Sequence, residues 1–151
     1  METSEYKNEI GYNYRMTNVI AAIGVAQLEV LDEYIAIKKA TFEKYKIEIK
    51  NIDGLDVVDV PDYADNNYWM LALQIDKNKY PLDREGLMKK LKKHNIQTRP
   101  IWYPNHLQKP YVDCQSYKIG NTLKLVEQTL NIPCSVNITD NEIELVIEKL
   151  S

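Results

Sequence analysis

The chain contains the stretch Glu9-Ile-Gly-Tyr-Asn-Tyr-Arg-Met-Thr-Asn18, which runs directly into Val19-Ile-Ala-Ala-Ile-Gly-Val-Ala-Gln-Leu-Glu29. A polar, aromatic loop is therefore followed at once by an apolar-periodic segment, with Thr17 or Asn18 as a suitable N-cap. Apolar residues continue to recur every three or four positions as far as Ile49. We predict one amphipathic helix of about 30 residues from Val19 to about Ile49, which makes it about 45 Å long. A helix of that length is expected to cross a domain boundary or an interface.

The remainder of the chain alternates short apolar runs with further helical patterns. Asp53 and Gly54 stop the first helix. Pro81-Leu-Asp83 opens a second helix, with Asn95 as its left-handed stop, and Thr139 with Glu142 predicts a capping box before the last one. The patterns predict strands at 55–60, 67–75 and 96–102, helices at 81–95, 117–129 and 139–150, and an irregular segment at 103–114. This order favours an α+β fold, in which a short, mainly antiparallel sheet is covered by helices.

Composition excludes several classes of protein. The 151 residues are 44% apolar and 27% charged with a net charge of −3, which is ordinary for one soluble domain. Basic residues are spread along the chain, so nucleic acid is not an expected partner. Two cysteines and two histidines lack metal-ligand spacing, and we expect no metal site. Without a long apolar run or a signal peptide, we expect no membrane partner and a cytoplasmic location.

The opening loop is the first candidate site. Asn13 and Arg15 alternate with Tyr12 and Tyr14, so an extended loop presents an amide and a guanidinium on the same side. This pair of groups suits a phosphate or a carboxylate. The alternative is structural, with Arg15 paired to Glu9 and Asn13 capping a turn.

A second candidate site follows the third predicted strand. Arg99, Trp102 and His106 lie within a short Pro-stiffened segment, and Tyr111 follows close behind. A cation, aromatic faces and an imidazole are suited to a sugar or a nucleotide. The alternatives are a core Trp102, a surface His106 and a Tyr111 that merely packs after Pro110. The two histidines lack a nearby nucleophile motif, so no Ser-His-Asp or Cys-His arrangement is expected.

The two candidate segments carry a family resemblance. Gly11-Tyr-Asn-Tyr-Arg-Met-Thr-Asn18, the segment Ile96-Gln-Thr-Arg-Pro100 and Ile132-Pro-Cys-Ser135 resemble the DegT/DnrJ/StrS family of sugar aminotransferases. These are pyridoxal 5′-phosphate (PLP) enzymes of aspartate-aminotransferase fold (fold type I) that aminate keto groups on nucleotide-linked sugars. The sequence around Gly11 most resembles that of members that act on UDP-linked 4-keto sugars in surface-glycan pathways. The resemblance covers about Glu5 to Leu150, but only the C-terminal part of the family.

The resemblance implies a domain organisation and roles for the candidate residues. Residues 1–16 form a cofactor-reaching loop, 17–50 a connector helix and 51–151 a small C-terminal α+β domain, while the large PLP-binding domain is absent. Two residues of the loop are implied to bind the cofactor: Asn13 donates to the cofactor phosphate of a neighbouring subunit, and Arg15 supports it. The implied contacts to the sugar nucleotide are Arg99, Trp102, His106 and Tyr111.

The resemblance also sets limits on activity. The lysine that forms the Schiff base belongs to the absent domain, so no residue here is expected to be catalytic. The cofactor is expected in the full-length enzyme and not on this chain alone. Glutamate is the implied amino donor, and a homo-oligomer is expected. Two alternatives remain: a non-catalytic ligand-binding or oligomerisation module derived from this family, and an unrelated α+β binding domain.

Overall fold

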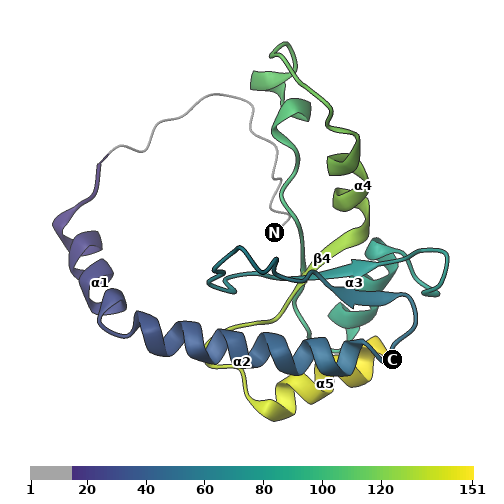
Figure 1. Cartoon of the computed structure of the whole chain (residues 1–151), viewed down its shortest axis with the longest axis horizontal. Helices are drawn as coiled ribbons and strands as arrows, with labels where there is room; N and C mark the ends of the chain where they lie inside the picture. Colours follow the sequence, from purple (N-terminus) through teal and green to yellow (C-terminus); the bar gives the residue numbers. More distant parts are fainter. Residues whose placement is uncertain (1–14) are drawn as a thin grey trace.

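The computed structural model describes residues 15–151 and contains a small sheet, five α-helices and two short 3-10 helices within that range (Figure 1). In chain order these are α1 (Asn18–Leu28), α2 (Leu31–Ile49), β1 (Leu55–Val57), β2 (Leu71–Ile75), α3 (Arg84–Lys93), β3 (Arg99–Pro100), η1 (Asn105–Leu107), η2 (Lys109–Tyr111), α4 (Gly120–Gln128), β4 (Thr129–Ile132) and α5 (Asp140–Leu150).

The sheet is antiparallel throughout, as predicted, in the order β1-β2-β4-β3. Leu73 of β2 lies opposite Val57 of β1 on one side and Leu130 of β4 on the other. The prediction missed β4 and placed its first residue, Thr129, in a helix. All four residues of β4 are buried, including Thr129 and Asn131, and the strand is paired on both edges. Such a strand lacks the polar–apolar alternation by which strands are recognised.

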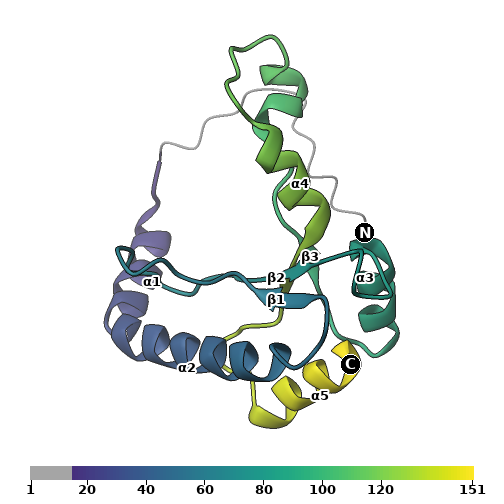
Figure 2. The ribbon, with the colours of Figure 1, turned by 45° about the vertical axis from the view of Figure 1, so that its right-hand side comes forward.

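The core lies between one face of this sheet and three helices. Leu71, Leu73 and Ile75 of β2 are buried, and the two residues between them are half-buried. In Figures 1 and 2, α2 and α5 lie side by side beneath the sheet, with α3 next to them. These helices contribute the buried residues Phe42, Tyr45, Ile49, Leu87, Leu91, Ile143, Val146 and Leu150. The fold is therefore α+β, with the helices covering one face of the sheet.

The first helical segment is not the single helix that periodicity predicted. Glu29 closes α1 by donating its amide hydrogen to the Val25 carbonyl, and Val30 has φ −117° and ψ 11°, outside the helical region. No proline or glycine marks this break in the sequence. The break separates a helix without any buried residue, α1, from a helix with four, α2. The two helices run in different directions on either side of this break (Figure 1).

Other boundaries are also shorter than predicted. The residues before β2, which the pattern placed in a strand, form a turn in which Tyr68 has a positive φ of 52°. The third strand is reduced to β3 because only Arg99 and Pro100 pair with β4. The helix expected from residue 117 begins at Gly120, after Lys118 at φ 49°.

Helix-end chemistry was predicted more accurately. Asp83 caps α3 by accepting the Gly86 amide hydrogen at 2.8 Å, and Asn95, at φ 60°, ends the segment. Thr139 and Glu142 form the predicted capping box at the start of α5.

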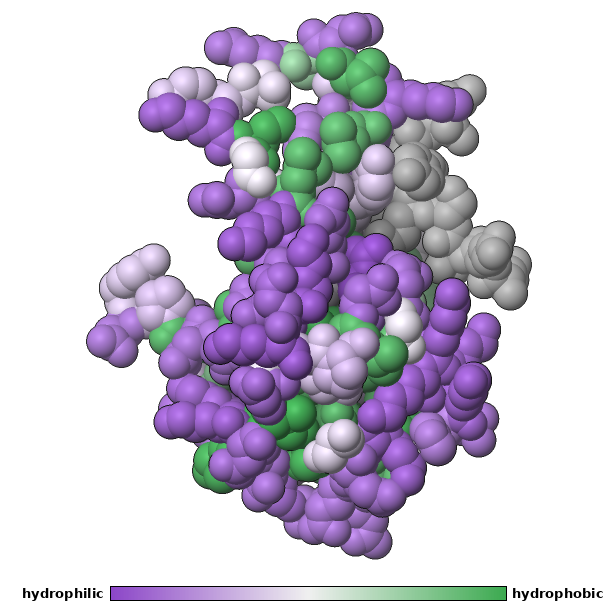
Figure 3. Space-filling model, turned by 90° about the vertical axis from the view of Figure 1, so that its right-hand side faces the viewer, coloured by the Kyte–Doolittle hydropathy of each residue, from purple (hydrophilic) through white to green (hydrophobic). Residues whose placement is uncertain are grey.

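Two parts of the chain project from this body. α1 extends to one side, and η1, η2 and α4 form an arm on the other (Figures 1 and 2). Figure 3 shows apolar patches, in green, on the arm as well as on the body below it. The exposed apolar residues of the arm include Val112, Leu123 and Leu125.

Candidate functional site

The cofactor-reaching loop is described only at its end. Asn13 lies outside the described residues, as does Glu9, the proposed alternative partner of Arg15. Arg15 itself is exposed and precedes α1, where the Thr17 hydroxyl accepts the Ile20 amide hydrogen at 3.4 Å. Arg15 forms no ion pair with any described residue.

These residues fit one end of the cofactor implied by the resemblance. An exposed guanidinium beside the free amides of a helix N-terminus suits a phosphate. A Schiff-base lysine is expected to lie in a desolvated pocket, whereas no lysine among residues 15–151 is buried. The exposed Arg15 guanidinium at the start of α1 is thus chemically suited to a phosphate.

The segment after β3 brings an aromatic residue into an unexpected pair. Trp102 is 59% exposed, which excludes the alternative that it belongs to the core. Its ring lies 5.8 Å, centroid to centroid, from that of Trp69, with an interplanar angle of 39°. Trp69 is equally exposed and precedes β2. Arg99, in β3, is also exposed and pairs through its backbone with Asn131 of β4.

His106 lies in η1 and is half-buried, so it is not simply a surface residue. Its Nε2 atom is buried and has no hydrogen-bond partner among the described residues. Nearby, the buried Gln108 donates from Nε2 to the Tyr103 carbonyl and the Asn105 side-chain oxygen, each at 3.2 Å, while its Oε1 has no described partner. Buried polar atoms without partners are uncommon in folded proteins, so this segment is a candidate for contact with a ligand or another surface.

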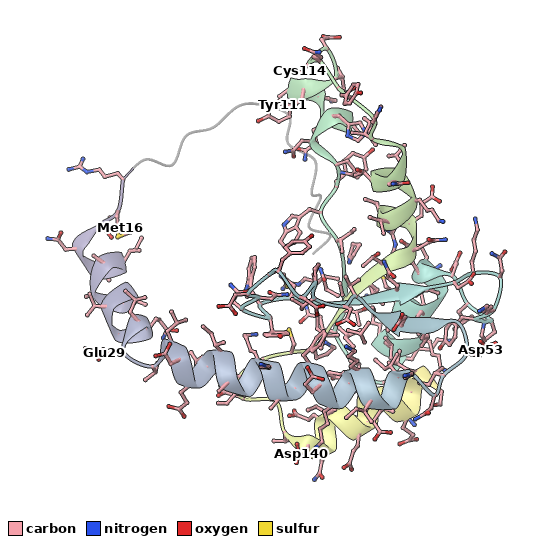
Figure 4. The ribbon with its side chains drawn as sticks, in the orientation of Figure 1. Met16, Glu29, Asp53, Tyr111, Cys114 and Asp140 are labelled. Carbon is pink, nitrogen blue, oxygen red and sulfur yellow. The ribbon has the colours of Figure 1, made fainter. Side chains whose placement is uncertain are left out.

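Tyr111 lies apart from the other candidates. It ends η2 and sits with Cys114 at the tip of the arm (Figure 4), where it is 38% exposed. In the described part of the chain, no hydrogen bond, ion pair or ring contact joins Tyr111 to Arg99 or Trp102. The structure thus brings Arg99 and Trp102 to one edge of the sheet and leaves Tyr111 at a distance.

Sequence reasoning missed a group of hydrogen bonds that joins Lys38, Cys134 and Trp69. Lys38, half-buried on α2, donates from Nζ to the Cys134 carbonyl at 2.7 Å and to the Trp69 carbonyl at 3.4 Å. The Cys134 thiol donates to the same Trp69 oxygen at 3.4 Å. The available signal was a lysine within the apolar stripe of a helix that packs on the core. That signal is weak because long lysine side chains often lie along apolar surfaces.

Tyr45 lies about two helical turns beyond Lys38, on the packed face of α2. Its hydroxyl is buried without a described hydrogen-bond partner. Burial raises the pKa of Tyr45 well above its ordinary value, and the nearby Cys134 and Glu142 add smaller contributions in the same direction. The phenol therefore remains neutral at physiological pH.

No group of three His, Cys, Asp or Glu side chains among residues 15–151 is arranged to hold a metal ion. No helix in the described range is long and apolar enough to cross a membrane.

Known proteins resemble this chain over nearly its whole length. It is 34% identical over 149 residues to the protein EpsN of Bacillus subtilis, covering 95% of this chain and 37% of that protein. It is 33% identical over 144 residues to the GDP-perosamine synthase of Escherichia coli O157:H7, covering 94% and 37% respectively. Among solved structures, DesI in the presence of its TDP-sugar product superposes with a TM-score of 0.83 at 26% identity, covering 93% of this chain and 36% of DesI.

The chain thus spans little more than a third of the length of these relatives. Its sheet and helices superpose on a sugar-nucleotide enzyme, and its residues 1–151 all match one family model. The chain therefore belongs to the DegT/DnrJ/EryC1/StrS aminotransferase family.

Proposed function

We propose that this chain is the C-terminal, smaller-domain part of a PLP-dependent aminotransferase that aminates a keto group on a nucleotide-linked sugar. Surface-glycan biosynthesis in the cytoplasm is the proposed setting, UDP the proposed nucleotide and glutamate the proposed amino donor. The observation that carries this proposal is the family match over residues 1–151. The similarity to GDP-perosamine synthase supports a sugar-nucleotide substrate.

Aminotransferases of this family depend on PLP, and the cofactor supplies an aldehyde and an electron sink for amino transfer. The part we assign to this chain is binding and orientation. Asn13 and Arg15 bind the cofactor phosphate, while Arg99, Trp102, His106 and Tyr111 border the sugar nucleotide. Residues 1–16, 17–50 and 51–151 serve as loop, connection and small domain. Alone, the chain does not transfer amino groups.

The exposed apolar surface of α1 supports a further part of the proposal, a homo-oligomer. A helix that is apolar on all sides is normally buried. α1 has no buried residue, and Val19, Ile23 and Leu28 are each more than half exposed. We place α1 at a contact with a second copy or with the remainder of the longer enzyme.

A chimaera tests the proposed reaction directly. This chain would replace the matching third of the E. coli GDP-perosamine synthase, and glutamate-dependent amination of nucleotide-linked keto sugars would be measured. We expect the chimaera to transfer amino groups and the chain alone to show none. A folded chimaera that binds PLP but transfers no amino group to any such sugar contradicts the proposal. A borohydride-trapped PLP adduct at one specific lysine of the chain alone would contradict the assignment of the reactive lysine elsewhere.

A further inference from the structure

The chain has two tryptophans, and the structure places them side by side in solvent. Trp69 and Trp102 lie on different loops, 5.8 Å apart between ring centroids, and each is 59% exposed. Large aromatic side chains usually bury most of their surface. A pair left open to solvent lies outside the core and is a candidate recognition surface. We call it the Trp69–Trp102 surface.

The turn that carries Trp69 is held in an unusual conformation. Tyr68 has φ 52°, in the left-handed region that residues with a side chain seldom adopt. Asn66 accepts the Tyr68 amide hydrogen and Asn67 accepts the Trp69 amide hydrogen, each at 3.0 Å. Strained backbone of this kind persists only where its surroundings fix it, and it concentrates at functional sites.

Two side chains of helix α2 contact this turn and hold it in place. Lys38 donates to the Trp69 carbonyl, and Phe42, one turn further on, packs its ring 4.9 Å from that of Tyr68. Lys38 and Phe42 face the same way because residues four apart share one side of a helix. The Lys38 bond to the Cys134 carbonyl at 2.7 Å ties the same turn to the segment after β4. These contacts hold the backbone of Trp69 and leave its ring exposed.

We infer that the Trp69–Trp102 surface stacks on the base of the nucleotide-linked substrate, and that Lys38 is the positioning residue that fixes Trp69 for this contact. The inference rests on the proposed function. Stacking tolerates any base, because every base has an aromatic face. That tolerance suits a family in which one relative is named for a GDP-linked sugar and another was solved with a TDP-sugar. The exposed Arg99, three residues before Trp102, adds a cation for the phosphates.

Tryptophan fluorescence, excited selectively over that of the tyrosines, reports on this surface alone, because the chain has no other tryptophan. The full chain would be titrated with UDP, GDP and dTDP, and with inorganic pyrophosphate, which lacks a base. We expect all three nucleotides to quench the emission and pyrophosphate to leave it unchanged. Trp69→Ala and Trp102→Ala should each weaken nucleotide binding about tenfold, with the remaining tryptophan as reporter. Quenching by pyrophosphate equal to that by UDP, or no quenching by any nucleotide, overturns the stacking assignment.

The role of Lys38 needs a readout that a purely structural lysine would not affect. Lys38→Met should weaken UDP binding about fivefold, and Lys38→Arg should restore it, since a guanidinium can donate to both carbonyls. Lys39→Met is the matched control, because Lys39 is the exposed neighbour on the same helix. If Lys38→Met lowers the urea midpoint but leaves UDP affinity unchanged, Lys38 is structural and the positioning role is wrong.

The chimaera separates failure of this inference from failure of the proposed function. If it aminates its sugar and Trp69→Ala leaves KM for the nucleotide sugar unchanged, the stacking inference alone is wrong. If the chimaera is inactive while nucleotide binding by the chain still depends on Trp69, the proposed reaction alone is wrong. An increase in KM with little change in kcat in the Trp69→Ala chimaera supports both.

Discussion

Tyr80 donates its phenolic hydrogen to the carbonyl oxygen of Leu150 at 2.6 Å, although the two residues are 70 positions apart. Both residues are buried. The carbonyl belongs to the last turn of α5, where helix geometry leaves backbone oxygens without partners. Burial raises the pKa of the Tyr80 hydroxyl, since the charged form would be desolvated. This bond joins the segment before α3 to the C-terminal end of the fold.

Tyr80→Phe should destabilise the chain, because it keeps the ring and leaves the Leu150 carbonyl buried without its donor. A buried unsatisfied group of this kind costs about 1–3 kcal/mol. Urea unfolding followed by circular dichroism measures the difference. Tyr63→Phe is the control, since Tyr63 is 92% exposed and should change nothing. Equal midpoints for both variants would show that the hydrogen bond contributes no net stability.

Gly54→Ala should be more damaging than its single methyl group implies. Gly54 has φ 78°, and a Cβ at this position would lie 2.4 Å from the Tyr80 amide nitrogen. We expect a loss of roughly 2 kcal/mol or more, from backbone strain together with the clash. Gly24→Ala, in α1 with open space around it, is the matched substitution and should stabilise by about 0.5–1 kcal/mol. The same sign for both variants in thermal unfolding would contradict the account.

Thr139→Ala should weaken the start of α5. The Thr139 hydroxyl accepts the Glu142 amide hydrogen at 3.3 Å, and the Glu142 carboxylate accepts both the Thr139 amide and hydroxyl hydrogens at 2.8 Å. Loss of an N-cap of this type costs about 0.5–2 kcal/mol. Thr139→Ser retains the hydroxyl and should recover most of the loss in urea unfolding. A Thr139→Ser variant as unstable as Thr139→Ala would assign the effect to the lost methyl group.

The same capping box predicts a dependence of stability on pH. The two hydrogen bonds from Thr139 lower the pKa of Glu142 below its ordinary value of 4.5. The folded state therefore binds this proton less readily than the unfolded state does. The resulting stabilisation is present above pH 4.5 and is lost as the pH falls through the folded-state pKa. The free energy of unfolding of Glu142→Gln should depend less on pH below 4.5 than that of the parent chain. Identical pH profiles for the two chains would exclude this contribution.

Helix-end chemistry could be predicted from the sequence because it depends on neighbouring residues. Asp83, Asn95 and the Thr139–Glu142 box act within one turn of the chain, and their patterns were sufficient. β4 depends on pairing between segments that are distant in the chain, and local patterns do not contain that pairing. The break at Val30 was also missed. A buried central strand and a helix interruption without proline or glycine leave no local signal.

The residues of the candidate site also differ in whether the local sequence reveals them. Arg99 and Trp102 were singled out as candidates because their residue types stand out within a short segment. Trp69 and Lys38 were not, because 31 positions separate them from each other and their contact exists only in the folded chain. The turn at Tyr68 was predicted as part of a strand, because an aromatic residue in an apolar run indicates a strand and not a positive φ.

The exposed apolar surface of α1 gives the last prediction, self-association of the chain. Ile20 and Ile23 are each more than half exposed, and no described residue covers α1. Burying such a surface against a second copy removes apolar area from water, and a symmetric dimer is the commonest closed arrangement. Light scattering should show a mass above that of one chain, and Ile20→Glu with Ile23→Glu should shift it towards the monomer. Ile47→Glu on α2 is the matched control, because Ile47 is equally exposed but isolated from α1. A monomeric parent chain at high concentration would contradict self-association through α1, and the helix would then be assigned to contact with the remainder of a longer enzyme.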